Sequence, residues 1–192
     1  MTRVTFLLPV LGHPRIHKRA QALERVGASV RLLAFERDVP FKRAALPPFE
    51  SLGRIESGRY LARSLPYAAA LARVREAAKS CDALYCFSAD LLALALVATT
   101  GLRRRPKLVC EVADIRSVLI GSSPTARAAR LVEAEVIRRA DLVVTPSQAY
   151  IEGFYGEVQG LHLSSFLLEN KVDGEILPAP ASPEHRRDDV LR

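Results

Sequence analysis

The 192-residue sequence has few of the residues that mark several common classes of protein. It contains no tryptophan, three cysteines and only 6% aromatic residues. Cys81, Cys86 and Cys110 are too few for a structural zinc site, which needs about four ligands in short paired spacings. We expect them to be buried, reduced thiols of a cytoplasmic protein. The scarcity of aromatic side chains also argues against stacking on single-stranded nucleic acid.

Long apolar runs and metal-binding spacings are missing as well. The longest charge-free apolar stretch, residues 91–102, is well short of the ~20 residues that span a bilayer. The four histidines are scattered along the chain, with no pair at a metal-ligand spacing: His13, His17, His162 and His185. We therefore expect no membrane span and no bound metal.

Charge is abundant but uneven along the chain. Residues 1–110 carry 19 Lys and Arg against 8 Asp and Glu, whereas residues 111–192 carry 9 against 13. The net charges are therefore +11 and −4. A positive field over the first part could attract phosphates, anionic lipid or nucleic acid, although ordinary solvated arginines account for most single positions. The 49% hydrophobic content indicates a globular domain rather than a disordered chain.

Hydrophobic patterning predicts an α/β fold, because short apolar runs alternate with helical periodicity. The first unit is a strand at Val4–Leu8, a helix at Pro14–Val26 and a strand at Ser29–Phe35. A strand–helix–strand unit of this kind requires parallel strands. Further strands are predicted at 52–55, 83–87, 107–112, 142–145 and 161–168, and further helices at 59–79, 89–99, 125–139 and 147–155. These elements predict one Rossmann-like, doubly wound parallel sheet with helices on both faces.

The turn after the first strand, Pro9–Arg15, is the first candidate site, since α/β sheets bind ligands where strands end. Gly12 stands alone there, which disfavours the three-glycine fingerprint of nicotinamide or flavin binding. The helix that follows begins with His13, Arg15 and Lys18. Cations at a helix start with free amides suit a phosphate or pyrophosphate. An ordinary turn followed by a solvated helix face explains the same residues equally well.

The second candidate site is Glu111–Arg116, at the end of the strand at 107–112. An acidic group at the end of an apolar strand is costly unless it is paired or used. Asp114 could accept a proton from a sugar hydroxyl, which makes it the candidate catalytic residue, or it could cap a helix or pair with Arg116. After the strand at 83–87, Ser88 and Asp90 are expected to cap a helix.

Three of the helices are predicted in more detail. The apolar face of the helix at 125–139 is expected to include Leu131, Val132 and Ile137. Glu133 would then be a solvated helix charge, as would Glu135. The helix at 59–79 is expected to bend at Pro66, and Ser147 is expected to cap the helix that follows it.

Taken in order, five segments resemble the N-terminal domain of family 4 glycosyltransferases of GT-B architecture. They are "HPRIHKRAQALERVGASVRLLAF", "CDALYCFSADLLALALVA", "PKLVCEVADIRSVL", "LVEAEVIRRADLVVTPSQAYIEGFY" and "FLLENKVDG". The resemblance spans residues 4–174 and is nearest to bacterial exopolysaccharide enzymes of the succinoglycan type. The sequence departs from the family at the lone Gly12 and at residues 112–114, where many members have a histidine.

The resemblance implies a domain plan and a reaction. Residues 1–174 would form the acceptor-side domain and residues 175–192 a proline-rich linker, with the donor-binding C-terminal domain absent from this chain. The enzyme would move a sugar from a nucleotide sugar, its donor substrate, to a saccharide or polyprenyl-diphosphate-linked acceptor, without a cofactor. The donor would be held by the missing domain or by a partner chain. The protein would be cytoplasmic, with a peripheral contact at the inner face of the membrane, in cell-surface polysaccharide synthesis.

The resemblance also assigns roles to the residues of the two turns. Gly12 and His13 would form the loop near the cleft, and Arg15 and Lys18 would face the acceptor or its phosphate. Asp114 and Arg116 would face the sugar.

Three alternatives remain. The first is a non-catalytic acceptor-binding subunit of a split glycosyltransferase. The second is a nucleotide-sugar epimerase-like protein. The third, a basic sheet protein that binds nucleic acid, is disfavoured, and we expect no nucleic-acid partner.

Overall fold

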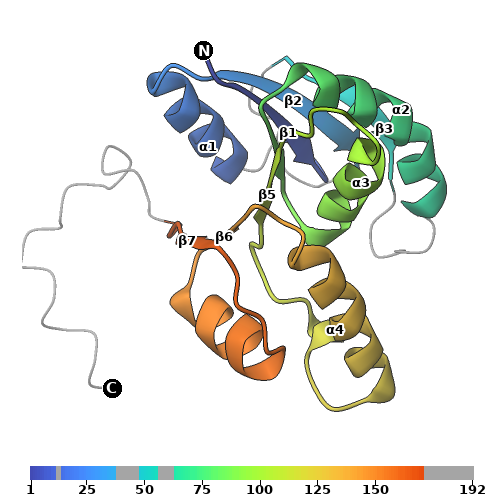
Figure 1. Ribbon diagram of the computed structural model, residues 1–192, viewed down its shortest axis with the longest axis vertical. Coiled ribbons are helices and arrows are strands. Elements are labelled where there is room, and N and C mark those ends of the chain that lie inside the picture. Colours follow the sequence, from blue (N-terminus) through green and yellow to red (C-terminus); the bar gives the residue numbers. More distant parts are fainter. Residues whose placement is uncertain (12–13, 38–47, 56–62, 171–192) are drawn as a thin grey trace, which may run out of the picture.

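The computed structural model describes residues 1–11, 14–37, 48–55 and 63–170 (Figure 1). The predicted linker at 175–192 and the candidate residues Gly12 and His13 lie outside the described residues. None of the helices within the described ranges is both long and apolar enough to cross a membrane.

One parallel sheet organises the described part of the chain. Its strand order is β3-β2-β1-β4-β5-β6-β7, and every neighbouring pair is parallel. The strands are β1 (Arg3–Leu8), β2 (Ser29–Glu36), β3 (Glu50–Arg54), β4 (Ala83–Cys86), β5 (Lys107–Glu111), β6 (Leu142–Thr145) and β7 (Ser165–Leu167). The predicted Rossmann-like sheet is therefore confirmed, although its last strand is shorter than the predicted 161–168.

Helices cover both faces of the sheet, as the strand order requires. From β1 the chain adds β2 and β3 toward one edge of the sheet. It then returns past β1 and adds β4, β5, β6 and β7 toward the other edge. Right-handed crossovers then place α1 on one face and the later helices on the other (Figure 1). The helices are α1 (Pro14–Arg25), α2 (Ser64–Ser80), α3 (Ala89–Thr99), the 3-10 turn η2 (Ser117–Leu119), α4 (Pro124–Ile137) and the π-helix η3 (Tyr150–Val158).

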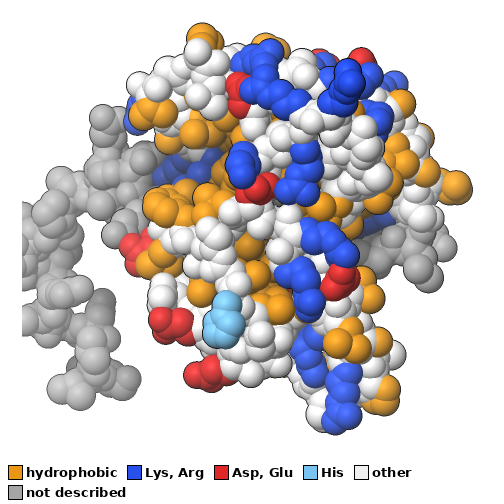
Figure 2. All heavy atoms as spheres, viewed as in Figure 1, with side chains coloured by type: hydrophobic (Ala, Val, Ile, Leu, Met, Phe, Trp, Pro, Cys, Tyr) orange, Lys and Arg blue, Asp and Glu red, His pale blue; other side chains and the backbone are white. Residues whose placement is uncertain are grey.

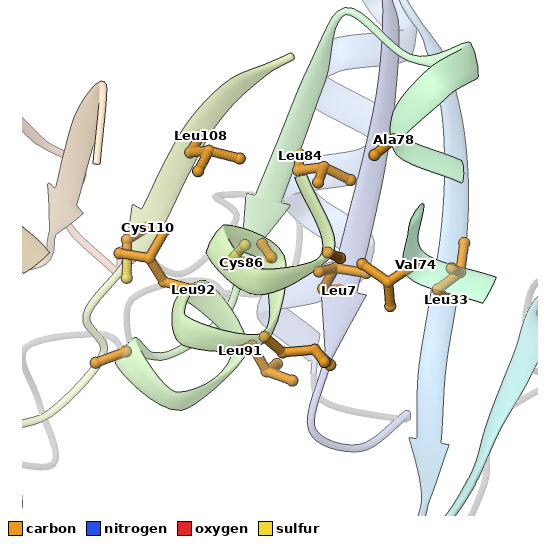
Figure 3. Close-up of a cluster of buried hydrophobic side chains, with 14 of the residues drawn as sticks. Leu7, Leu33, Val74, Ala78, Leu84, Cys86, Leu91, Leu92, Leu108 and Cys110 are labelled. Carbon is orange, nitrogen blue, oxygen red and sulfur yellow. The ribbon is translucent and has the colours of Figure 1, made fainter. Parts of the chain in front are cut away.

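The larger hydrophobic core lies between the sheet and the helices after β3. In the core, Leu84 of β4 and Leu108 of β5 are fully buried, and Leu91 and Leu92 of α3 pack against the same cluster (Figure 3). The three cysteines are buried free thiols, as expected. A smaller cluster under α1 includes Phe6 and Tyr85, whose ring centroids are 5.0 Å apart.

The predicted apolar face of α4 is confirmed at Ile137 and wrong at Leu131 and Val132. Leu131 and Val132 are 73% and 67% exposed, whereas Glu133 is only 7% exposed. Ile137 is buried as predicted, together with Ala126 and Ala134. Small side chains let the helix approach the core closely, so their spacing, rather than that of the bulkier residues, fixes its rotation. Glu133 is thereby carried inward, and its prediction as a solvated charge is also wrong.

The predictions about helix starts are confirmed at some positions and wrong at others. Ser147 caps the following helix, since its Oγ accepts a hydrogen bond from the Ala149 amide at 3.3 Å. Ser88, by contrast, makes no side-chain cap at α3. The helix around Pro66 begins at Ser64, so Pro66 lies in the first turn. Amides there have no partner within the helix, and the proline requires no bend.

Candidate functional site

A hollow of about 490 Å³ opens at the carboxyl ends of β1, β4 and β5. The chain's crossovers diverge beside β1 and β4, and ligands of open α/β sheets bind at such a switch point. Its described lining comes from loops after four strands and from two helices: Pro9, Arg37, Arg63, Phe87, Ser88, Ala89, Asp90, Glu111, Val112, Ala113, Asp114, Arg116 and Glu133. The lining is therefore rich in paired charges.

Glu111, the last residue of β5, is the most deeply buried of these charges, at 2% exposure. The side chains on β5 alternate between faces, so Cys110 enters the larger core and Glu111 points toward α1. There Arg15 Nη1 lies 3.6 Å from Glu111 Oε1, and Arg19 Nε lies 3.5 Å from Oε2. The Tyr85 hydroxyl donates to Oε2 at 2.7 Å. Two arginines and a phenol thus offset the cost of burying this carboxylate.

Asp90, in the first turn of α3, forms a second charge network. It accepts a hydrogen bond from the Tyr67 hydroxyl at 2.9 Å and one from Arg63 Nη1 at 3.2 Å. Burial raises the pKa of the Asp90 carboxyl, but the Tyr67 hydrogen bond and the nearby guanidinium charges outweigh burial. The pKa of Asp90 consequently lies below its ordinary value. This network ties the start of α2 to the start of α3 at the rim of the hollow.

Ser88 joins β4 to α3 with an unusual backbone. Its φ of 153° and ψ of 162° make it the one non-glycine residue with positive φ among the described residues. Such a conformation costs of order 1–3 kcal/mol and is found most often at functional sites. Ser88 also lines the hollow. The strained turn and the charge networks therefore occupy the same place.

Asp114 and Arg116 both line the hollow, on the loop after β5. Asp114 is exposed, and Tyr150 Oη lies 3.4 Å from its Oδ1. Arg116 is half-buried, and its charge lowers the pKa of both Asp90 and Glu133. The structure thus brings these two predicted residues together with carboxylates of α3 and α4. The catalytic role of Asp114 stays a prediction.

Glu133 reaches the hollow from α4. Its Oε2 accepts a hydrogen bond from Gln159 Nε2 at 3.3 Å. Burial raises the pKa of the Glu133 carboxyl above its ordinary value of 4.5, and the Arg116 charge and the Gln159 hydrogen bond only partly offset this. A carboxyl whose pKa is raised by burial beside a hollow is a common feature of binding and catalytic sites.

The predicted residues of α1 are placed differently from those of the β5 loop. Arg15 contacts the site through Glu111, and Lys18 is half-buried but is not among the lining residues. Sequence reasoning included Glu111 in the second candidate site without giving it a role, and it interpreted Glu133 as a solvated charge. The four-residue spacing of Arg15 and Arg19, on one helix face, could have pointed to a buried acidic partner.

The arrangement suits recognition of a polar ligand by hydrogen bonds and charge. Carboxylates accept hydrogen bonds from hydroxyl groups, and guanidinium groups donate to oxygen atoms. Within the described ranges, no three His, Cys, Asp or Glu side chains are grouped so as to hold a metal ion.

Comparison with known proteins assigns the fold to a family. Residues 12–157 match the glycosyl transferase 4-like domain, and the chain belongs to this family. It is 29% identical over 191 residues to the succinoglycan biosynthesis protein ExoL of Rhizobium meliloti (strain 1021), covering 95% of this chain and 47% of ExoL. The chain therefore spans about half the length of this relative.

Solved glycosyltransferase structures share the fold over a similar half. The lipopolysaccharide outer core galactosyltransferase WaaB matches with a TM-score of 0.61 and 15% identity, over 89% of this chain and 46% of WaaB. HepE of Anabaena, solved in complex with UDP, matches with a TM-score of 0.58 and 22% identity, over 90% and 45% of the two chains. Sucrose-phosphate synthase from Thermosynechococcus elongatus matches with a TM-score of 0.60 and 11% identity, over 88% and 48%.

Proposed function

We propose that this chain is the acceptor-side domain of a family 4 glycosyltransferase that acts in cell-surface polysaccharide synthesis. The acceptor is a saccharide or a polyprenyl-diphosphate-linked acceptor, and the domain works in the cytoplasm at the inner face of the membrane. A nucleotide sugar is held by a second domain or a partner chain. The family match and the likeness to a succinoglycan biosynthesis protein support this proposal.

The observation that carries the proposal is the hollow at the switch point of the sheet. Four carboxylates line it, from strand β5, the loop after β5, and helices α3 and α4: Asp90, Glu111, Asp114 and Glu133. Hydroxyl-rich ligands suit such a lining, because each carboxylate oxygen can accept more than one hydrogen bond. The position also suits transfer, since the carboxyl edge of the sheet is where a facing domain would present a donor.

The relatives support the placement of the donor outside this domain. The chain covers only 45–48% of the glycosyltransferases that share its fold. HepE was solved with UDP and with UDP-glucose. The departing diphosphate would be stabilised by basic side chains and helix N-termini at the facing surfaces.

A transfer assay tests the proposed function. The purified chain is incubated with radiolabelled UDP-glucose and a membrane lipid extract, alone and fused to the donor half of ExoL. We expect no transfer by the chain alone, because half of the reacting geometry is missing. The fusion should label the lipid fraction, and Asp114→Asn should lower that labelling. Robust turnover by the isolated chain would contradict the proposed division of labour, as would a folded, UDP-binding fusion that transfers nothing.

The second candidate function is a non-catalytic acceptor-binding subunit of a split glycosyltransferase. In that case the chain binds the acceptor and a separate chain of similar size brings the donor. Affinity purification from the source cells distinguishes the two arrangements: a stoichiometric partner favours the split enzyme, whereas a solitary chain disfavours it.

A further inference from the structure

We propose that the α4 wall of the hollow binds a hydroxyl of a neutral sugar ring and disfavours phosphate, with Glu133 as the residue that determines this specificity. The inference rests on the proposed function, because it names which part of the acceptor this wall contacts. Its residues are Glu133 at the surface of the hollow, with Gln159 and Tyr155 behind it.

Glu133 has hydrogen-bonding capacity to spare. It is 7% exposed, yet it lines the hollow. In the described part of the chain its one hydrogen bond runs from Gln159 Nε2 to Oε2, at the long distance of 3.3 Å. The other carboxyl oxygen, Oε1, is left to accept a hydrogen bond from a ligand. A buried carboxylate with so few partners is costly unless something else binds it.

Two further polar atoms next to Glu133 have no partner. The Tyr155 hydroxyl and Gln159 Oε1 are both buried without a hydrogen bond among the described residues. The charges of Glu133 and Arg116 both act on the Tyr155 hydroxyl, so it belongs to the same cluster. Tyr155 lies in the π-helix η3 and Gln159 directly follows it. Helices of this kind are rare and are frequent at functional sites.

The charges around the hollow favour a hydroxyl over a phosphate at this wall. Arg63 is paired with Asp90, and Arg15 and Arg19 are paired with Glu111. Several of the nearby cations are thus already offset by protein carboxylates. A phosphate at the α4 wall would meet the carboxylate of Glu133, whereas a hydroxyl can donate to it.

Binding to the intact chain, followed by amide NMR, tests the assignment. The probes are cellobiose, a neutral disaccharide, and inorganic pyrophosphate. We expect cellobiose to shift the amides of residues 112–116 and 88–90. Glu133→Gln should weaken cellobiose roughly tenfold, which is the loss of one hydrogen bond to a charged group. Pyrophosphate should leave these amides unshifted.

Glu135→Gln is the matched control, because Glu135 lies on the exposed face of the same helix and pairs with Arg138 and Arg139. It should bind cellobiose as the unchanged chain does. Gln159→Leu provides a second variant, should Glu133→Gln fail to fold. It removes the one hydrogen bond to Glu133 together with the unpartnered Oε1, and it should also weaken cellobiose.

The outcomes separate this inference from the proposed function. Unchanged cellobiose affinity in folded Glu133→Gln, or in Gln159→Leu, would overturn the role of the α4 wall while leaving acceptor binding intact. Pyrophosphate shifts at residues 112–116 would overturn the preference for a hydroxyl. Absence of any cellobiose shift at the hollow would overturn the inference as well, and the transfer assay would then decide separately whether the proposed function stands.

Discussion

The two edges of the sheet carry similar charges in opposite settings. At the amino edge, Asp82 pairs with Arg104 at 3.0 Å and Asp141 pairs with Lys107 at 2.9 Å, and both cations are more than three-quarters exposed. At the carboxyl edge, Glu111 is 2% exposed and its arginine partners come from α1, far away in the sequence. Blue and red side chains lie side by side at the top of Figure 2, where β1 begins in Figure 1.

The amino-edge carboxylates serve the fold. Asp82 accepts the Arg3 amide at 2.9 Å, and Asp141 accepts the Leu108 amide at 2.8 Å. Each carboxylate precedes one strand and holds the start of its neighbour, so it helps to fix strand register. Exposed pairs of this kind cost little to form and contribute little.

The carboxyl-edge charges are costly by comparison. Burying a carboxylate and its arginines is seldom the most stable solution, because apolar residues of equal volume often do as well or better. Charges kept in such a place, beside a strained Ser88 and a hollow, point to ligand binding. The contrast between the edges thus separates charges that hold the fold from charges that serve the site.

Removing the Glu111 carboxylate should have the largest effect on stability. Glu111→Gln leaves the guanidinium groups of Arg15 and Arg19 largely buried without their counter-charge, which typically costs about 3 kcal/mol. Urea unfolding of the purified chain measures this loss. The amino-edge variant Asp82→Asn should lose less free energy of unfolding than Glu111→Gln. An equal loss in the two variants would contradict the proposed difference between the two edges.

Removing the phenol that supports Glu111 should have a smaller effect. Tyr85→Phe deletes the 2.7 Å hydrogen bond to Glu111 Oε2 and should lower the free energy of unfolding by about 1.5 kcal/mol. The double variant with Glu111→Gln should lose less than the sum of the single losses, since the two groups share one network. Strict additivity would show that the hydrogen bond contributes nothing.

Glu133 at the carboxyl edge and Asp141 at the amino edge should respond oppositely to pH. The pKa of Glu133 is raised by burial, so its contribution to stability is present below about 4.5 and is lost as pH rises through the higher folded pKa. Burial also raises the pKa of Asp141, but the Leu108 amide and the Lys107 and Arg105 charges outweigh it and lower the pKa. Its contribution is therefore present above 3.8 and is lost as pH falls through the folded pKa.

Unfolding free energies of Glu133→Gln and Asp141→Asn, measured from below 3.8 to neutral pH, check this pair. As pH rises, the original chain should lose free energy of unfolding relative to Glu133→Gln. Over the same pH range, the original chain should gain free energy of unfolding relative to Asp141→Asn. Parallel slopes for the two variants would contradict the assignment.

An exposed amino-edge cation should have the smallest effect. Arg104→Ala removes a 79% exposed partner of Asp82 and should change the free energy of unfolding by less than about 0.5 kcal/mol. Added salt should erase even that difference. A loss comparable to that of Tyr85→Phe would mean that the amino edge is more tightly coupled than its exposure indicates.

Most of the fold could be predicted from the sequence, because the local hydrophobic periodicity indicates where strands and helices of this kind lie. Val4–Leu8 and Ala89–Thr99 could be placed within a residue or two. The rotation of α4 could not, since Leu131 and Val132 are the natural apolar choice until the close approach of Ala126 and Ala134 is known. Because of that error, Glu133 was predicted to be exposed to solvent and not to line the hollow.

The pairing of charges at the site could not be predicted from the local sequence either. Asp114 and Arg116 follow a strand directly, so their place at the hollow was predictable. The two arginine partners of Glu111, by contrast, lie roughly a hundred positions earlier in the chain. Which arginine meets which carboxylate depends on how α1 lies across the sheet, and the local sequence does not specify that contact.

Locating a bound sugar on the chain tests the central claim most directly. An amide NMR map with a neutral disaccharide in large excess reports every contacted residue at once. The account predicts shifts confined to the carboxyl edge, around Ser88, Asp114 and Arg116, with the signals near Asp82 and Asp141 unmoved. Shifts centred on the amino edge would contradict it.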